Sequence, residues 1–244
     1  MLKYSLLLNQ VILPDPLGLW PAPLELTLEL KEILLIEKVG ADKSAPLLEV
    51  ASSLHPPVAG RVWHWGLDAF SLAREERYYL RRRIAYLAPG QVLLNRLTLG
   101  ENIALSPCYH MGKSSRAVLA EHADLLEQLA LRPYLPLFPQ EVEEDVYLRA
   151  LWARELIKKP DLILAALDKS WQTLLAPSQA ILFLETYLAT QGGAALLLGP
   201  SLQNFYPLAS RLLRLESGRL IAHPLAEHQG RPLTDFLPLV MGEE

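Results

Sequence analysis

A lysine and a serine, Lys43 and Ser44, end a short segment that has the spacing of a phosphate-binding loop. In the pattern G-x-x-x-x-G-K-[ST], glycines let backbone N–H groups surround phosphate oxygens, the lysine contacts the outer phosphates and the hydroxyl binds Mg²⁺. Gly40 occupies an inner position of the segment, but Glu37 and Asp42 replace the two defining glycines. We interpret Gly40, Lys43 and Ser44 as the remnant of a nucleotide-binding loop.

Two features of the segment oppose phosphate binding. The Asp42 carboxylate would lie roughly 4 Å from a polyphosphate, where like charges repel by ~1 kcal/mol in water and ~4 kcal/mol at a surface-like dielectric. Pro46 is tolerated mainly in the first turn of a helix, so we predict a helix over residues 46–54 that starts later than in a working loop. An ordinary helix cap with Asp42 as the N-cap explains the same residues equally well. We therefore expect no bound cofactor, with ATP binding left open.

Apolar runs and helical spacings surround this segment. Strict alternation from Leu24 to Leu30 predicts a half-buried strand, and the run Ile33–Ile36 predicts a buried strand that enters the loop. Further strands are expected at 4–13, after residue 62, and at 84–87, 162–167, 194–198, 211–216 and 219–222. Helices are expected at 72–83, 97–105, 115–131, 146–158, 178–190 and 202–209. Buried strands alternating with helices indicate an α/β fold with a mainly parallel sheet, and residues 97–157 indicate an inserted helical lobe.

The composition excludes several classes of protein. The chain has 244 residues, 51% of them hydrophobic, and a formal net charge of −4 without a basic stripe, so no nucleic acid partner is expected. The single Cys108 excludes an internal disulfide framework and gives no metal-ligand spacing, so we expect no metal site. Because no apolar run reaches the roughly 18 residues of a membrane span and no signal peptide is recognisable, we expect a cytoplasmic protein with no direct membrane span.

Three further segments resemble the ATP-binding domain of ABC transporters. Residues 153–164 are similar to the A-R-A-L run that precedes the family's second nucleotide motif. Residues 82–105 resemble its R-R-x-I-G-Y-V and L-T-V-x-E-N-V segments, and residues 213–220 resemble its L-x-x-G-x-I hairpin. Within the family, the sequence of residues 101–110 and 131–134 is most similar to that of the ATPase subunits of MCE-type lipid-trafficking systems.

The resemblance implies a P-loop NTPase-like core with an antiparallel β subdomain and an inserted helical subdomain. We expect one ABC-ATPase-like domain over residues 1–223, with its helical lobe at about 97–157, and a C-terminal tail over residues 224–244.

The resemblance also places the family's functional positions, most of which carry other residues here. The glutamine that links nucleotide to the membrane subunit falls on Pro89, and the L-S-G-G-Q signature falls on the acidic segment 142–146. The Mg²⁺-organising aspartate and the general-base glutamate fall on Ala166 and Leu167, and the switch histidine falls on Pro200. Because these side chains cannot hold a metal ion or take a proton, we interpret the chain as a pseudo-ATPase without catalytic residues, and not as an enzyme.

The function that the resemblance implies is a structural or regulatory one. We expect a catalytically inactive subunit of a membrane transport complex for lipid or phospholipid trafficking, peripheral at the inner face of the cell membrane. Its expected partners are an integral membrane permease, which contacts residues 88–110, and an active ABC ATPase or a second copy of the chain. One alternative is a divergent P-loop ATPase or kinase with weak activity that uses Lys43, Ser44 and Asp168. Another is a soluble regulatory protein without a membrane partner.

Overall fold

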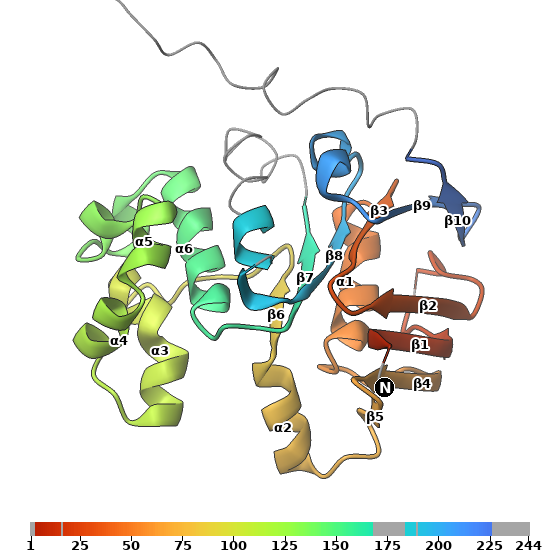
Figure 1. Ribbon diagram of the computed structural model, residues 1–244, viewed down its shortest axis with the longest axis horizontal. Coiled ribbons are helices and arrows are strands. Elements are labelled where there is room, and N and C mark those ends of the chain that lie inside the picture. The colour runs from red at the N-terminus through yellow and green to blue at the C-terminus, as the bar shows by residue number, and fades with distance from the viewer. Residues whose placement is uncertain (1–2, 16, 168–183, 189, 226–244) are drawn as a thin grey trace, which may run out of the picture.

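Figure 1 shows the computed structural model of the chain, which describes residues 3–15, 17–167, 184–188 and 190–225. Asp168, most of the helix expected at 178–190 and nearly all of the expected tail lie outside these residues.

Two sheets form the framework. An antiparallel sheet has the strand order β2-β1-β4-β5 and contains β1 (Tyr4–Ile12), β2 (Leu24–Glu29), β4 (Ala59–His64) and β5 (Leu67–Asp68). A second sheet has the order β10-β9-β3-β8-β7-β6 and contains β3 (Ile33–Glu37), β6 (Ile84–Leu87), β7 (Leu162–Ala166), β8 (Ala194–Leu198), β9 (Arg211–Glu216) and β10 (Arg219–His223). Its pairings are parallel except that of β10 with β9. The expected mainly parallel core sheet and antiparallel β subdomain are therefore confirmed.

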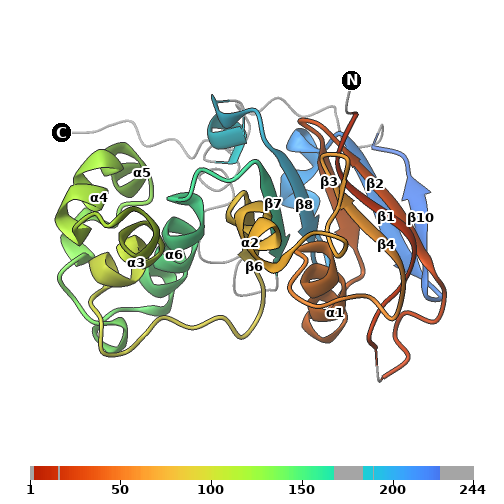
Figure 2. The same ribbon diagram turned by 90° about the horizontal axis from the view of Figure 1, so that it is seen from below.

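Helix α1 (Ala41–Ala51) lies between the two sheets (Figures 1 and 2). Its fully buried Leu47 and Leu48 belong to one hydrophobic cluster with Leu6 of β1 and Leu34 of β3. The prediction that this helix starts near Pro46 is wrong, because Pro46 lies inside the helix. A proline in a helix interior costs about 3 kcal/mol. Burial of each large apolar side chain contributes about 1.5–3 kcal/mol, so the packed face of α1 outweighs the proline.

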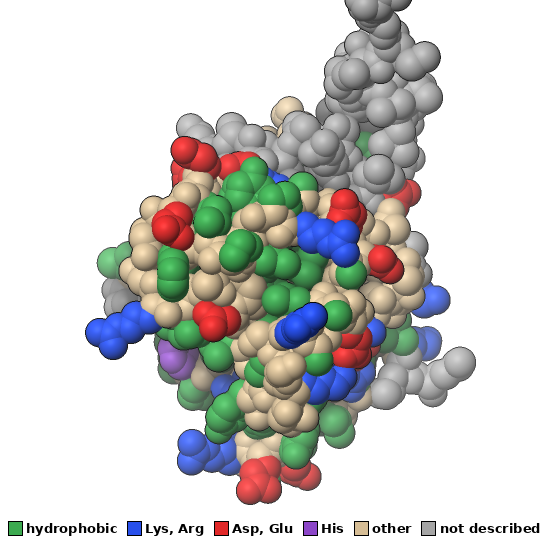
Figure 3. Space-filling view, turned by 90° about the vertical axis from the view of Figure 1, so that its left-hand side faces the viewer, with side chains coloured by type: hydrophobic (Ala, Val, Ile, Leu, Met, Phe, Trp, Pro, Cys, Tyr) green, Lys and Arg blue, Asp and Glu red, His purple; other side chains and the backbone are tan. Residues whose placement is uncertain are grey.

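The remaining helices cover the other side of the parallel sheet or form a separate lobe. They are α2 (Arg74–Arg82), α3 (Leu99–Met111), α4 (Ser115–Glu121), α5 (Ala123–Gln128), α6 (Glu144–Leu156) and the helical residues 184–188, with short 3₁₀ turns at η1 (Arg132–Tyr134), η2 (Pro139–Glu141) and η3 (Gln203–Leu208). We call α3 to α6 the helical lobe; Figure 3 turns its outer face to the viewer. The inserted lobe is confirmed, but the single helix expected over 115–131 is wrong, because the chain breaks at His122.

Local hydrogen bonds explain where the lobe begins and where it breaks. The Thr98 hydroxyl accepts from the Glu101 N–H (3.2 Å) and the Glu101 carboxylate accepts from the Thr98 N–H (2.8 Å), which is a capping box at the start of α3. The fully buried Asn102 amide donates to the carbonyls of Leu94, Leu97 and Thr98 and so fixes the preceding loop. His122 takes a non-helical conformation, in which its Nε2 donates to the Ile157 carbonyl (2.9 Å).

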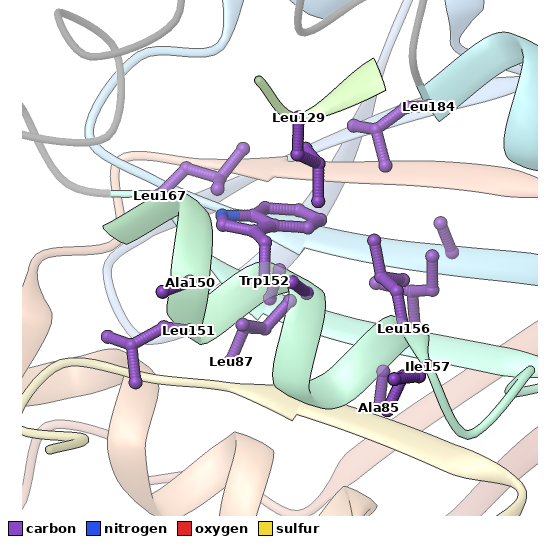
Figure 4. Close-up of a cluster of buried hydrophobic side chains, with 14 of the residues drawn as sticks. Ala85, Leu87, Leu129, Ala150, Leu151, Trp152, Leu156, Ile157, Leu167 and Leu184 are labelled. Atoms are coloured by element: carbon purple, nitrogen blue, oxygen red, sulfur yellow. The ribbon is translucent and has the colours of Figure 1, made fainter. Parts of the chain in front are cut away.

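A second hydrophobic cluster joins the lobe to the sheet (Figure 4). Trp152 of α6 is 4% exposed and lies among Leu87, Leu129 and Leu167, which come from the sheet and from the lobe. Within the described part of the chain, no helix is long and apolar enough to cross a membrane.

Candidate functional site

Three parallel neighbours, β3, β8 and β7, end at the same edge of the sheet, and the loops that follow them are held together by backbone hydrogen bonds. The Val39 N–H donates to the Gly199 carbonyl (3.1 Å), and the Gly199 N–H donates to Ile36 (3.0 Å). On the β7 side of β8, the Leu167 N–H donates to the Leu198 carbonyl (2.6 Å). A Cβ atom at Gly199 would lie 2.6 Å from the Leu167 carbonyl oxygen, so this close approach requires glycine. The carboxyl edge of a parallel sheet is where ligands of α/β proteins commonly bind.

The N-terminus of α1 faces this edge. Gly40 is its N-cap in an extended conformation, and the Gly40 carbonyl accepts from the N–H groups of Lys43 (3.1 Å) and Ser44 (3.0 Å). The helix therefore begins at the loop itself, and not later as the sequence predicted. The first N–H groups of a helix have no acceptor inside it and carry about half a positive charge, which suits an anion.

Asp42 already brings a carboxylate to this helix end. A Cβ atom added to Gly40 would lie 2.8 Å from the Asp42 Oδ1, so the side chain folds back over Gly40. A carboxylate in the first turn stabilises a helix by about 0.3–1 kcal/mol. Asp42 is exposed, so its side chain can turn away into solvent. The alternative of a plain Asp42 N-cap does not hold, since Gly40 is the N-cap.

Lys43 and Ser44 lie in the first turns of α1, whereas the sequence predicted them in a loop before the helix; Ser44 is 2% exposed and Lys43 is half-buried. Sequence reasoning missed the residue that fixes them. The buried Trp20 indole donates to the Lys43 carbonyl (2.9 Å), and the Asp15 carboxylate accepts from the Trp20 N–H (2.5 Å). No local pattern marks Trp20, since it comes from the connection between β1 and β2.

Glu37 forms a buried network at the start of the loop. Its Oε1 accepts from the Leu202 N–H and the Tyr206 hydroxyl, both at 2.8 Å, and its Oε2 accepts from the Arg214 Nε (3.0 Å). Burial and the hydrogen bond to Glu37 raise the pKa of Tyr206, and hydrogen bonds to Tyr206 and Glu37 raise the pKa of Arg214. The network joins the loop after β3 to the segment after β8. Its partners lie up to 177 positions away along the chain, which is why no sequence pattern revealed them.

The structure brings some of the other candidate positions to the same edge and leaves the rest away from it. Ala166 ends β7 and Leu167 follows it, while the Pro200 carbonyl accepts from the Lys38 N–H (3.4 Å) beside the loop. Pro89 follows β6 at the outer edge of the sheet. The acidic segment 142–146 lies at the start of α6, where its carboxylates complement the helix dipole.

Known proteins that resemble this chain are ATP-binding subunits of transport systems. No protein-family model matches the chain. The lipoprotein-releasing system ATP-binding protein LolD of Shewanella denitrificans is 28% identical over 192 residues, which cover 78% of this chain and 81% of that protein. LolD of Psychrobacter arcticus is 28% identical over 197 residues, 80% of this chain and 86% of that protein. The macrolide export ATP-binding/permease protein MacB of Bartonella henselae is 25% identical over 205 residues, 82% of this chain and 30% of that protein.

Solved structures agree on the fold. A dimeric post-hydrolysis state of the ATP-binding cassette MJ0796, bound to ADP and Pi, has a TM-score of 0.76 at 19% identity and covers 90% of this chain and 98% of that one. CbiO1 from Clostridium perfringens, part of the ABC transporter complex CbiONQ, has a TM-score of 0.70 at 12% identity and covers 92% of this chain and 90% of that one. The chain has the fold of ABC ATPase domains.

These comparisons overturn one prediction. The relatives are named ATP-binding proteins, and ATP-binding subunits of ABC systems are ATPases, so the interpretation of this chain as a non-enzyme is wrong. That interpretation counted substituted motif positions one at a time. It also took the helix to start after the loop, whereas the structure places the helix N-terminus at the sheet edge.

Proposed function

We propose that this chain is the ATP-binding, ATP-hydrolysing subunit of an ABC-type transport system. The observation that carries the proposal is the sequence match to LolD proteins over about four fifths of both chains. From the sequence, one alternative was a divergent P-loop ATPase or kinase, and this proposal keeps the ATPase. Asp168, the acid named in that alternative, lies outside the described residues.

The residues at the start of α1 fit the phosphates of ATP. The helix N-terminus supplies backbone donors, Lys43 supplies an ammonium group and Ser44 supplies a hydroxyl of the kind that binds Mg²⁺. Gly40 itself adds no side chain at the helix entrance, where the Asp42 carboxylate opposes the phosphates until it turns aside. Because Asp42 is exposed and its side chain can turn into solvent, it weakens nucleotide binding without preventing it. When bound, Mg²⁺ neutralises phosphate charge, and the chain's own groups position the nucleotide.

We further propose a lipid-linked cargo and a membrane-embedded partner. The LolD relatives are named for lipoprotein release, and the resemblance of residues 101–110 points to lipid trafficking of the MCE type. Residues 88–110 present large exposed apolar side chains, including Val92 (65% exposed), Leu94 (49%) and Tyr109 (83%). Such a surface suits an integral membrane permease, with this chain peripheral at the inner face of the membrane. The solved relatives include dimers, so we propose that the chain pairs with a second ATP-binding subunit, either an identical copy or a paralogue.

The test uses the full chain, alone and together with the membrane protein that co-purifies from its host. Thermal stabilisation by MgATP measures nucleotide binding, and phosphate release measures turnover. We expect Lys43→Ala to weaken nucleotide binding by about tenfold, because one charge-assisted phosphate contact is lost. Lys31 is an exposed lysine at the opposite end of β3, so Lys31→Ala is the matched control. It should change neither nucleotide binding nor phosphate release. The absence of both binding and phosphate release from chain and complex alike would refute the proposal.

A further inference from the structure

A buried glutamate lies at each end of β3, and each pairs with an arginine of the neighbouring strand β9 (Figure 1). Glu32, 9% exposed, precedes the strand, and its Oε1 lies 2.9 Å from the Arg211 Nε. Glu37, 4% exposed, ends the strand, and its Oε2 accepts from the Arg214 Nε (3.0 Å). The two pairs have the same chemistry, but the Glu37 pair lies where the nucleotide loop begins and the Glu32 pair lies at the opposite edge of the sheet.

Glu37 stands where a phosphate-binding loop has its first glycine. A glycine has no side chain and leaves the backbone free to adopt many conformations. The Glu37 carboxylate instead ties the start of the loop to the Leu202 N–H and the Tyr206 hydroxyl after β8, and to Arg214 of β9. The start of this loop is therefore fixed by contacts within the protein itself.

The next residue of the loop, Lys38, depends on such support. Its φ is 61°, a left-handed conformation that residues with a side chain adopt at an energetic cost. Its Nζ lies 2.6 Å from the Glu216 Oε1 at the end of β9, and its N–H donates to the Pro200 carbonyl (3.4 Å). The hairpin formed by β9 and β10 thus contacts two consecutive residues of the loop, through Arg214 and Glu216.

The same hairpin also lies close to the segment that fixes the start of α1. Gly218 is in its turn, and a Cβ atom there would lie 2.5 Å from the Pro21 Cδ. Pro21 follows Trp20, whose indole donates to the Lys43 carbonyl (2.9 Å). The hairpin therefore contacts the start of the loop directly and the first turn of α1 through the segment that carries Trp20.

We infer that Glu37 is a positioning residue for nucleotide binding, which acts with the β9–β10 hairpin to set where the first N–H groups of α1, Lys43 and Ser44 stand. The inference rests on the proposed function and adds to it a residue and a hairpin that determine nucleotide affinity without contacting phosphate. A loop that is already ordered loses less conformational freedom when it binds a ligand. Without Glu37, the loop start and Lys38 can relax to more common conformations, and binding must restore the original one.

The first experiment measures MgATP affinity by calorimetric titration of the full chain, at a temperature where circular dichroism shows every variant to be folded. Glu37→Ala should weaken MgATP binding about tenfold. Glu32→Ala is the matched control, because it breaks a buried pair with the same strand at the opposite edge of the sheet. It should change the affinity by less than about twofold. Equal weakening by the two variants would overturn the inference, because a general loss of stability would then explain both.

Milder variants keep the test decisive if Glu37→Ala does not fold. Glu37→Gln keeps an oxygen that can accept from Leu202 and Tyr206 but loses the charge that faces β9, and Tyr206→Phe removes one donor to Glu37. Each should weaken MgATP binding about threefold, with Glu32→Gln as the unaffected control. Affinities equal to that of the unmodified chain for both variants would overturn the inference.

The second experiment measures amide hydrogen exchange by NMR and needs no nucleotide. Glu37→Ala should speed exchange of the Lys38 and Leu202 amides at least tenfold, whereas Glu32→Ala should act near Ala195, whose N–H donates to the Glu32 carbonyl (2.9 Å). Unchanged exchange at Lys38 would overturn the inference and leave the proposed function intact. If the unmodified chain binds no MgATP and releases no phosphate, the proposed function fails, and this inference fails with it.

Discussion

The start of the nucleotide loop and the groove between α2 and the helical lobe, which Arg81, Arg82 and Lys159 line, hold their charges in opposite ways. At the loop start, Glu37 is 4% exposed and meets a cation, a hydroxyl and a backbone N–H. In the groove, Arg81, Arg82 and Lys159 form no ion pair in the described part of the chain.

The difference separates charges that hold the fold from charges that are available to a partner. A buried carboxylate whose oxygens are all bound stabilises one arrangement, and removal of either partner leaves a costly unpaired group. Exposed unpaired cations contribute little to folding but attract an acidic partner. Substitutions in the two regions should therefore affect different measurements.

The largest effect on stability is expected from Glu37→Ala. It leaves the Arg214 guanidinium and the Leu202 N–H without their acceptor in a largely buried place. Breaking a buried ion pair costs about 3–5 kcal/mol, and we expect about 3 kcal/mol because the Arg214 side chain is 26% exposed. Urea unfolding measures the change in the free energy of unfolding.

Glu37→Gln is the matched variant, since it keeps an oxygen that can accept from Leu202 and Tyr206. It should lower the free energy of unfolding by less than Glu37→Ala. Lys38→Ala removes the exposed Lys38–Glu216 pair next in the chain and should cost under about 1 kcal/mol. Equal losses for Glu37→Ala and Lys38→Ala would show that the Glu37 network does not stabilise the fold.

Acid should destabilise the protein through His64, a second buried polar group of the framework. Its Nε2 lies 3.0 Å from the Ser53 hydroxyl, and burial lowers the pKa of His64 from 6.5 to about 4. The folded state therefore holds a neutral imidazole. This contribution to stability is complete above pH 6.5 and is lost as the pH falls from 6.5 toward 4, by about 2 kcal/mol at pH 5.

Urea unfolding at pH 7 and pH 5 measures this loss. Carboxylates also titrate in acid, so the comparison is with His64→Phe, which should lose about 2 kcal/mol less between the two pH values. Parallel pH profiles for the two proteins would contradict the assignment.

Asp42→Gly, which restores a glycine to the loop, should strengthen nucleotide binding. This effect is smaller than the two expected on stability. Removing the carboxylate removes a repulsion of about 1–4 kcal/mol from the phosphates, partly relieved in the native chain when Asp42 turns aside. We expect MgATP binding to tighten about tenfold, equivalent to about 1.4 kcal/mol. Asp42→Asn removes the charge but keeps nearly the same shape. Its comparison with Asp42→Gly therefore separates the effect of the charge from that of the added backbone freedom. A titration that shows weaker binding for both variants would mean that Asp42 assists the nucleotide.

Sequence patterns predicted the parts of this fold that depend on local periodicity. The buried run Ile33–Ile36 and the alternation Leu24–Leu30 gave strands within one residue of the observed bounds. The start of α1 was mispredicted because the cost of Pro46 is local, whereas the packing of Leu47 and Leu48 against two sheets is not.

The candidate site was predictable in the same partial way. The spacing singled out Gly40, Lys43 and Ser44, which lie together at one helix end, but it placed the start of that helix at Pro46, after all three. The Trp20 contact and the Glu37–Arg214 pair were not predictable, since they join segments 23 and 177 positions apart. The groove was hidden for the same reason, because Arg82 and Lys159 become neighbours only when α2 and α6 end side by side.

The smallest effect on stability is expected in the groove, and it sharpens the comparison with Glu37 most directly. Arg82→Gln with Lys159→Gln removes two cations that have no ion pair in the described part of the chain, so the free energy of unfolding should change by no more than about 0.5 kcal/mol. Lower repulsion among the remaining cations can even raise it. A loss above about 2 kcal/mol would show that these cations support the fold, as the Glu37 network does.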